Sequence, residues 1–74
     1  MWQLFELKDG FTVFCDTIDT RNGFAHVGTL FDSNGMEITK TRINYINRTW
    51  ERYAYETILK ELKKFLRERR KERG

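Results

Sequence analysis

The sequence contains no proline, one cysteine, one histidine and five glycines in 74 residues. A lone cysteine, Cys15, excludes an intrachain disulfide and a cysteine-based metal cluster. A lone histidine, His26, excludes a zinc site built on paired histidines. We therefore expect no metal and no other cofactor. Without proline, nothing in the sequence stops a C-terminal helix before Gly74.

Long apolar runs are also missing. No run approaches the roughly 18 residues that are needed to cross a bilayer. Residues 1–6 lack the basic segment and the long apolar stretch of a signal peptide. We expect a cytoplasmic protein without a membrane partner.

What the chain does have is aromatic side chains, which make up 15% of its residues, within a hydrophobic fraction of 39%. This composition is too apolar for a disordered chain. Large aromatic side chains also offset the small core of a chain this short. We expect a single domain over residues 1–74.

Charge is distributed unevenly along the chain. Residues 1–46 contain four Lys and Arg against six Asp and Glu, whereas residues 47–74 contain ten against five. The net charge of +3 therefore combines an acidic first part with a basic second part. Attraction to nucleic acid is expected only in the second part.

Three dipeptides mark turns at regular spacing: Asp9-Gly10, Asn22-Gly23 and Asn34-Gly35. The segments around them, 2–7, 11–20, 24–31 and 36–43, are rich in β-branched and aromatic residues. They predict an antiparallel meander of three or four strands, with the sheet at about 2–43. The last turn either has two residues or is a longer loop over 32–35.

After residue 43 the apolar period changes from two to 3.6, which predicts one amphipathic helix over about 47–70 that Asn47 caps. The fold class is thus α+β, in the order β-β-β-β-α. The predicted apolar stripe of the helix consists of Ile46, Trp50, Tyr53, Ala54, Ile58, Leu62, Phe65 and Leu66.

Two-residue turns would set the register of the hairpins. They place Phe5 opposite Phe14 in the first hairpin and Ile38 beside Phe31 in the third. One face then collects apolar side chains, and we predict that the helix packs on it. This face would contain Phe5, Leu7, Phe14, Ile18, Ala25, Val27, Phe31 and Ile38.

A single helix covers only one side of a sheet, so the other side is a candidate interface. We predict that a second copy of the chain or a host protein binds there. The predicted partner-binding residues are Trp2, Leu4, Phe11, Val13, Cys15 and Leu30. The alternative is that strand twist and the N-terminus cover this patch.

The helix end is the second candidate surface. Apolar positions stop at Leu66, so residues 67–74 should project beyond the sheet or fray. Basic side chains there and just before could contact phosphates without sequence choice. The alternative is a solvated helix end without a ligand. The residues concerned are Lys60, Lys63, Lys64, Arg67, Arg69, Arg70, Lys71 and Arg73.

Catalytic chemistry is not indicated. In the predicted register Cys15 and His26 lie about 13 Å apart, too far for a nucleophile and its base. Asp19 opposite His26 is interpreted as a structural contact. Neither a metal-binding loop nor a glycine-rich phosphate loop is present. We expect no enzymatic activity and no small-molecule substrate.

Trp50, Tyr53 and Tyr55 have two interpretations. They could form a platform on which bases stack. Because Trp50 and Tyr53 belong to the predicted apolar stripe, packing in the core is favoured, with only Tyr55 pointing elsewhere.

The residues at 47–59, Asn-Arg-Thr-Trp-Glu-Arg-Tyr-Ala-Tyr-Glu-Thr-Ile-Leu, carry a family resemblance. This segment resembles one near the C-terminus of small uncharacterised proteins of bacteriophages and other mobile elements, mostly of Gram-positive hosts. The resemblance implies a phage-type accessory protein with no assigned enzymatic activity, and it transfers no functional residue.

The expected architecture is also similar to the sheet-plus-helix DNA-binding domains of some transposon integrases. Those domains read the major groove with the sheet, which requires a basic sheet face. The face predicted to be exposed here is apolar and acidic, so this analogy is disfavoured. We predict a non-enzymatic accessory protein that forms a homodimer or inhibits a host or defence protein. Binding of nucleic acid by the basic helix is the alternative.

Overall fold

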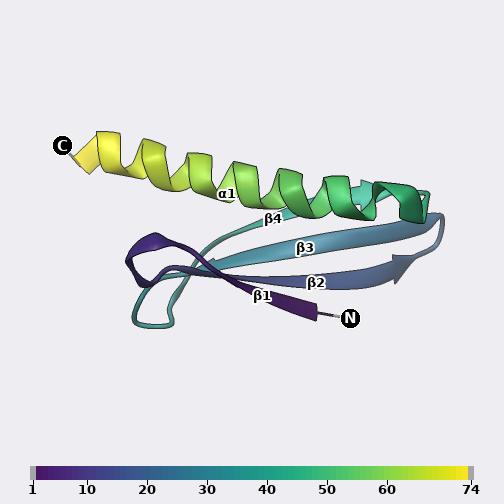
Figure 1. Cartoon of the computed structure of the whole chain (residues 1–74), viewed down its shortest axis with the longest axis horizontal. Coiled ribbons are helices and arrows are strands. Elements are labelled where there is room, and N and C mark those ends of the chain that lie inside the picture. The colour runs from purple at the N-terminus through teal and green to yellow at the C-terminus, as the bar shows by residue number, and fades with distance from the viewer. Residues whose placement is uncertain (1, 74) are drawn as a thin grey trace.

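The structure is a computed structural model. It describes residues 2–73 of the chain, with side chains described for residues 2–69. Four antiparallel strands form one sheet in the order β1-β2-β3-β4, and a long helix follows (Figure 1). The predicted α+β meander is confirmed. The elements are β1 (Trp2–Glu6), a 3-10 turn η1 (Lys8–Gly10), β2 (Thr12–Thr20), β3 (Gly23–Phe31), β4 (Glu37–Tyr45), a 3-10 turn η2 (Arg48–Trp50) and α1 (Glu51–Arg73).

The first hairpin turns through three residues rather than two. The N–H of Leu7 donates to the carbonyl of Phe11 at 2.8 Å, and the chain between them forms η1. Asp9 and Gly10 both have positive φ, at 63° and 82°, which suits these residue types. The extra turn residue shifts the register by one, so Phe5 pairs with Val13 and Leu4 with Phe14. The predicted pairing of Phe5 with Phe14 is wrong.

The registers of the other two hairpins also differ from the predicted ones. The second turn consists of Arg21 and Asn22, one position before the predicted pair, so Thr20 pairs with Gly23. This slip moves the β2–β3 register by two residues, which leaves every side chain on its predicted face. In the third hairpin a bulge after Leu30 pairs Phe31 with Glu37. The predicted pairing of Ile38 with Phe31 is therefore wrong. Ile38 packs against the core instead.

Asp32 organises the loop between β3 and β4. Its carboxylate accepts hydrogen bonds from the backbone N–H groups of Asn34 and Met36, both at 2.9 Å. Its own N–H donates to the carbonyl of Met36. The longer loop, one of the two predicted alternatives, is thus the one that forms.

The core lies between the sheet and α1, which runs over β3 and β4 (Figure 1). Its fully buried centre consists of Val13, Cys15, Leu30, Ile58 and Leu62. Gly28 makes the close approach possible, because a Cβ atom there would lie 2.4 Å from Cγ2 of Ile58.

The helix packs on the sheet face that was predicted to be exposed. Val13, Cys15, His26, Gly28 and Leu30 lie beneath it and are buried. Of the predicted core face, only Phe5, Leu7 and Ile38 pack against this cluster. Phe14, Ile18, Val27 and Phe31 point to the opposite side. The grouping of the β2 and β3 side chains into two faces was correct, but the choice of the covered face was wrong.

The start of the helix follows its predicted cap. The side chain of Asn47 accepts a hydrogen bond from the N–H of Thr49 at 3.0 Å, and η2 leads into α1. The inward face of α1 differs from the predicted stripe at its N-terminal end. Ala54, Ile58 and Leu62 are buried as predicted. Ile46, Trp50 and Tyr53 are exposed instead, and so is Phe65 further along the helix. Tyr55, predicted to point elsewhere, packs against the core.

The last turns of α1 project past the sheet (Figure 1). This agrees with the predicted projection beyond Leu66. The helix continues to Arg73, past the predicted end near residue 70.

Candidate functional site

The predicted partner-binding residues are divided between the two sides of the sheet. Val13, Cys15 and Leu30 have no exposed surface, and Phe11 packs against their cluster. The prediction that these four residues lie on an exposed sheet face is therefore wrong. Its cause is the choice of the covered face, since α1 takes the side on which Gly28 leaves room for Ile58.

Trp2 and Leu4 are exposed, at 62% and 55% of their surface, on the side of the sheet away from α1. We call this side the open face, because none of the elements in the described part of the chain covers it. Its apolar side chains come from β1, β2 and β3. They are Trp2, Leu4, Phe14, Ile18, Val27 and Phe31.

These apolar residues form a connected surface. The rings of Trp2 and Phe14 stack at 5.6 Å between centroids, and Leu4 pairs directly with Phe14 across the strands. Ala25 and Thr29 lie on the same face and are almost fully buried.

Charges on the open face are separated by strand. Glu6 of β1 and Asp16 of β2 lie on one side, and Lys40 and Arg42 of β4 lie on the other. Lys40 also pairs with Glu37 at 3.5 Å, where both side chains are more than half exposed. The first two strands are thus acidic, and β4 is basic over most of its length.

The basic residues predicted for nucleic-acid binding lie on the solvent side of α1 where they are described. Lys60, Lys63, Lys64 and Arg67 are exposed, and Arg69 is half-buried. The side chains of Arg70, Lys71 and Arg73 lie outside the described residues. Within residues 2–69, ion pairs join only Lys40 to Glu37 and Arg52 to Glu56, so none of the ion pairs there involves these helix cations.

An exposed aromatic cluster stands at the N-terminal end of α1. Trp50 and Tyr53 are 54% and 59% exposed, and their rings meet edge to face at 5.7 Å. Ile46 lies beside them and is 80% exposed. The interpretation of Trp50 and Tyr53 as core residues is wrong, and the period of the sequence around residue 50 gave no sign of it.

A buried polar network lies beneath the first turns of α1. The hydroxyl of Thr17 hydrogen-bonds to Nδ1 of His26 at 3.0 Å and to the hydroxyl of Tyr55 at 3.1 Å. The hydroxyl of Tyr45 reaches Nε2 of His26 at 3.3 Å, and the Tyr55 ring lies 4.0 Å from the imidazole. Sequence reasoning missed this network because it treated Tyr55 as outward and paired His26 with Asp19.

The network is built to hold a neutral imidazole. Burial lowers the pKa of His26 below its ordinary value, and the charge and backbone of Glu51 oppose this only in part. Burial together with the charge of Glu51 raises the pKa of Tyr45. The partner of His26 across the strands is Thr17, not Asp19 as predicted.

Cys15 is unsuited to nucleophilic chemistry. Its thiol is fully buried, and burial with the nearby charge of Asp16 raises its pKa to about 11. It pairs with Gly28 across the strands, so His26 is two positions away along β3. The predicted separation of four positions is therefore wrong, because the slip of the β2–β3 register reduces it to two.

Two further searches of the described residues have negative results. No group of three or more His, Cys, Asp or Glu side chains there could hold a metal ion. Nor does this part of the chain include a helix with the length and hydrophobicity that a membrane span requires.

The two exposed surfaces, the open face and the solvent side of α1, are thus the candidate sites, and they lie on opposite sides of the molecule. Comparison of the chain with known protein families, curated proteins and solved structures gives no match.

Proposed function

We propose that the protein is a non-enzymatic binding protein whose open face pairs with the open face of a second copy. The observation that supports this most strongly is the exposure of connected apolar side chains on that face. Trp2, Leu4 and Ile18 are 62%, 55% and 43% exposed. Soluble monomers rarely leave a contiguous apolar patch of more than a few hundred Å² uncovered.

The charges of the open face favour a second copy over an unrelated partner. A symmetric dimer needs a surface that is complementary to itself. A two-fold axis parallel to the strands would stack β1 of one copy over β4 of the other. Asp16 and Arg42 lie in the same row across the sheet. The rotation would bring the acidic side of each sheet toward the basic side of the other.

Aromatic contacts support the same arrangement. Trp2 is in the row of Asp16 and Arg42. Under this two-fold rotation its ring would lie over Arg42 of the second copy. Arginine stacks favourably on the face of an indole ring. In the same row Val27 would lie over Asp16 of the second copy, which leaves Asp16 one strand away from Arg42 of that copy.

The open face is also large enough. Four strands spaced about 4.8 Å apart and roughly 25 Å long give a footprint of roughly 500 Å². Side chains roughen this footprint, so the accessible area is greater and approaches the roughly 800 Å² per partner of a standard interface.

The oligomeric state tests the proposal. Sedimentation equilibrium over a concentration series should show a dimer for the wild type and a monomer for Ile18→Glu, because the two-fold rotation would bury this carboxylate against Ala25 of the second copy. Met36→Glu is the matched control. Met36 is 66% exposed in the loop between β3 and β4 and lies off the open face, so this variant should dimerise normally.

A charge exchange tests the two-fold arrangement itself. Asp16→Lys and Arg42→Asp should each weaken the dimer, and the double variant should recover much of the loss. A wild type that stays monomeric at high concentration would overturn the proposal. A dimer that Ile18→Glu leaves intact would do the same. In either case the open face would be left for a different protein, such as the host or defence protein that the phage-like resemblance suggests.

A further inference from the structure

The solvent side of α1 combines aromatic and basic side chains in one line. Lys60, Lys64 and Arg67 lie seven, eleven and fourteen positions after Tyr53. At 3.6 residues per turn these positions lie within about 60° of one another around the helix. Each of the four side chains is exposed. A continuous strip thus runs from an aromatic end to a basic end.

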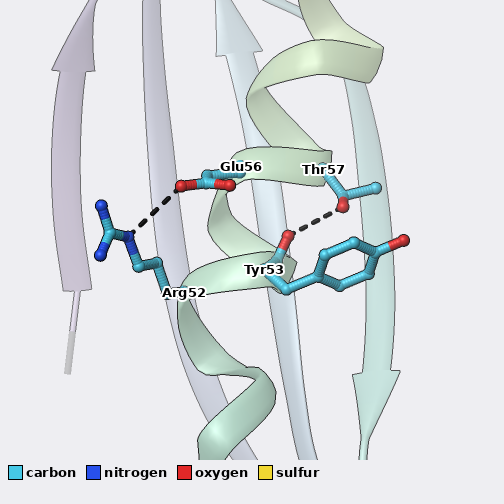
Figure 2. A network of polar contacts seen from close by, with 4 residues as sticks. All are labelled: Arg52, Tyr53, Glu56 and Thr57. Carbon is cyan, nitrogen blue, oxygen red and sulfur yellow. Dashed lines mark hydrogen bonds and ion pairs between the residues drawn. The ribbon is translucent and has the colours of Figure 1, made fainter.

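The aromatic end has the form of a stacking surface. Trp50 and Tyr53 stand beside Ile46 at the end of β4, where they border a hollow of about 310 Å³. Figure 2 shows the ring of Tyr53 directed away from the helix, with its backbone carbonyl accepting the hydroxyl of Thr57 at 2.8 Å. The ring itself is 59% exposed to solvent.

Two carboxylates near the middle of the strip are turned away from it or already bonded, whereas Glu68 and Glu6 lie near its basic end at Arg67. Glu56 pairs with Arg52 at 3.4 Å on the side of the helix opposite the Tyr53 ring (Figure 2). Glu61 accepts a hydrogen bond from the hydroxyl of Thr41 at 2.9 Å. The positive charge of Lys60, Lys64 and Arg67 is therefore little offset by these two carboxylates.

From this geometry we infer that the strip binds single-stranded nucleic acid. Bases stack on Trp50 and Tyr53, and the phosphates that follow contact Lys60, Lys64 and Arg67. Unspecific single-strand binding requires this combination, a basic track joined to aromatic rings on which bases stack. A duplex hides its base faces and would use only the basic end.

The dimensions fit a short segment. The strip from Tyr53 to Arg67 is about 21 Å long at 1.5 Å per residue. That length accommodates about six nucleotides at the 3.4 Å spacing of one strand. The strip lies on the far side of the molecule from the open face, so this inference does not depend on the proposed dimer.

Fluorescence anisotropy with labelled 12-mers tests the inference. Oligo-dT and oligo-rU should both bind at low salt, and a 12-base-pair duplex should bind more weakly. Preference for one of the two single strands would identify whether DNA or RNA is the ligand. Trp50→Ala should weaken single-strand binding between about fivefold and a hundredfold, as expected for one lost stacking contact.

Matched controls separate the aromatic end from general effects. Tyr53→Ala should weaken single-strand binding in the same direction as Trp50→Ala. Met36→Ala removes an exposed apolar side chain far from α1, so it should leave the affinity unchanged. Circular dichroism of each variant confirms that the helix is intact. Unchanged affinity in both Trp50→Ala and Tyr53→Ala would overturn the stacking surface.

Salt dependence tests the basic end. Single-strand binding that uses Lys60, Lys64 and Arg67 should give a slope of log K against log salt of about −2, and Lys64→Gln should reduce its magnitude by about 0.7. Arg21→Gln removes one charge at the β2–β3 turn and should not change the slope. Absence of single-strand binding at low salt, or binding of duplex and single strand with equal affinity, would overturn the inference.

Discussion

On one face of the sheet Val13, Cys15 and Leu30 are fully buried under α1, while on the other Trp2 and Leu4 leave more than half of their surface exposed. The two faces are both apolar, so hydrophobicity does not distinguish them. They differ in surface shape. The covered face has Gly28 at its centre, where Ile58 enters, and the open face presents the stacked rings of Trp2 and Phe14. A helix packs on the face whose shape it fits, and the other face stays exposed.

The largest expected effect on stability comes from replacing a leucine on the covered face, and the same replacement on the open face serves as the comparison. Leu30→Ala should lower the free energy of unfolding by about 2–5 kcal/mol, because it leaves a cavity in the core. Leu4→Ala should change it by about 0.5 kcal/mol or less. Urea unfolding at a protein concentration too low for association measures both. Similar losses for the two variants would contradict the assignment of the faces.

How much of this arrangement can be predicted from the sequence depends on one turn. The grouping of β2 and β3 side chains survived a register slip of two residues, because a slip of two preserves the faces. In the first hairpin the positive φ of Asp9 extends the turn to three residues, and the slip of one exchanges the faces of β1. Turn signals locate a hairpin, but they do not give the number of residues in its turn.

The candidate sites were predictable to different degrees. The exposed lysines of α1 follow from their spacing and from the end of the apolar stripe. Trp50 and Tyr53 were assigned to the core because their spacing matches that of Ala54 and Ile58. In the structure Trp50 belongs to η2, whose 3-10 geometry changes the phase. Tyr55 turns inward instead, because its hydroxyl finds a buried partner in Thr17.

The close fit of the covered face can be broken at its centre. Gly28→Ala would place a Cβ atom 2.4 Å from Cγ2 of Ile58, and we expect a loss of about 1–3 kcal/mol in unfolding free energy. The double variant with Ile58→Ala removes the clashing atom. Its loss should be smaller than the sum of the two single losses. Additive losses would show that Gly28 is not the point at which the helix enters the sheet.

The smallest expected effect concerns the polar part of the covered face, where His26 is held neutral among Thr17, Tyr45, Tyr55 and Glu51. Its pKa is lowered in the folded protein, so the unfolded chain binds the proton first, near pH 6.5. Stability is therefore complete above pH 6.5 and falls as the pH decreases below it, by at most about 1.4 kcal/mol per pH unit. Urea unfolding at pH 7.5 and 5.5 measures the loss. His26→Gln retains a neutral polar side chain that cannot be protonated, and it should lose less stability over the same interval. If wild type and variant respond equally to pH, the buried imidazole does not govern the acid sensitivity of this face.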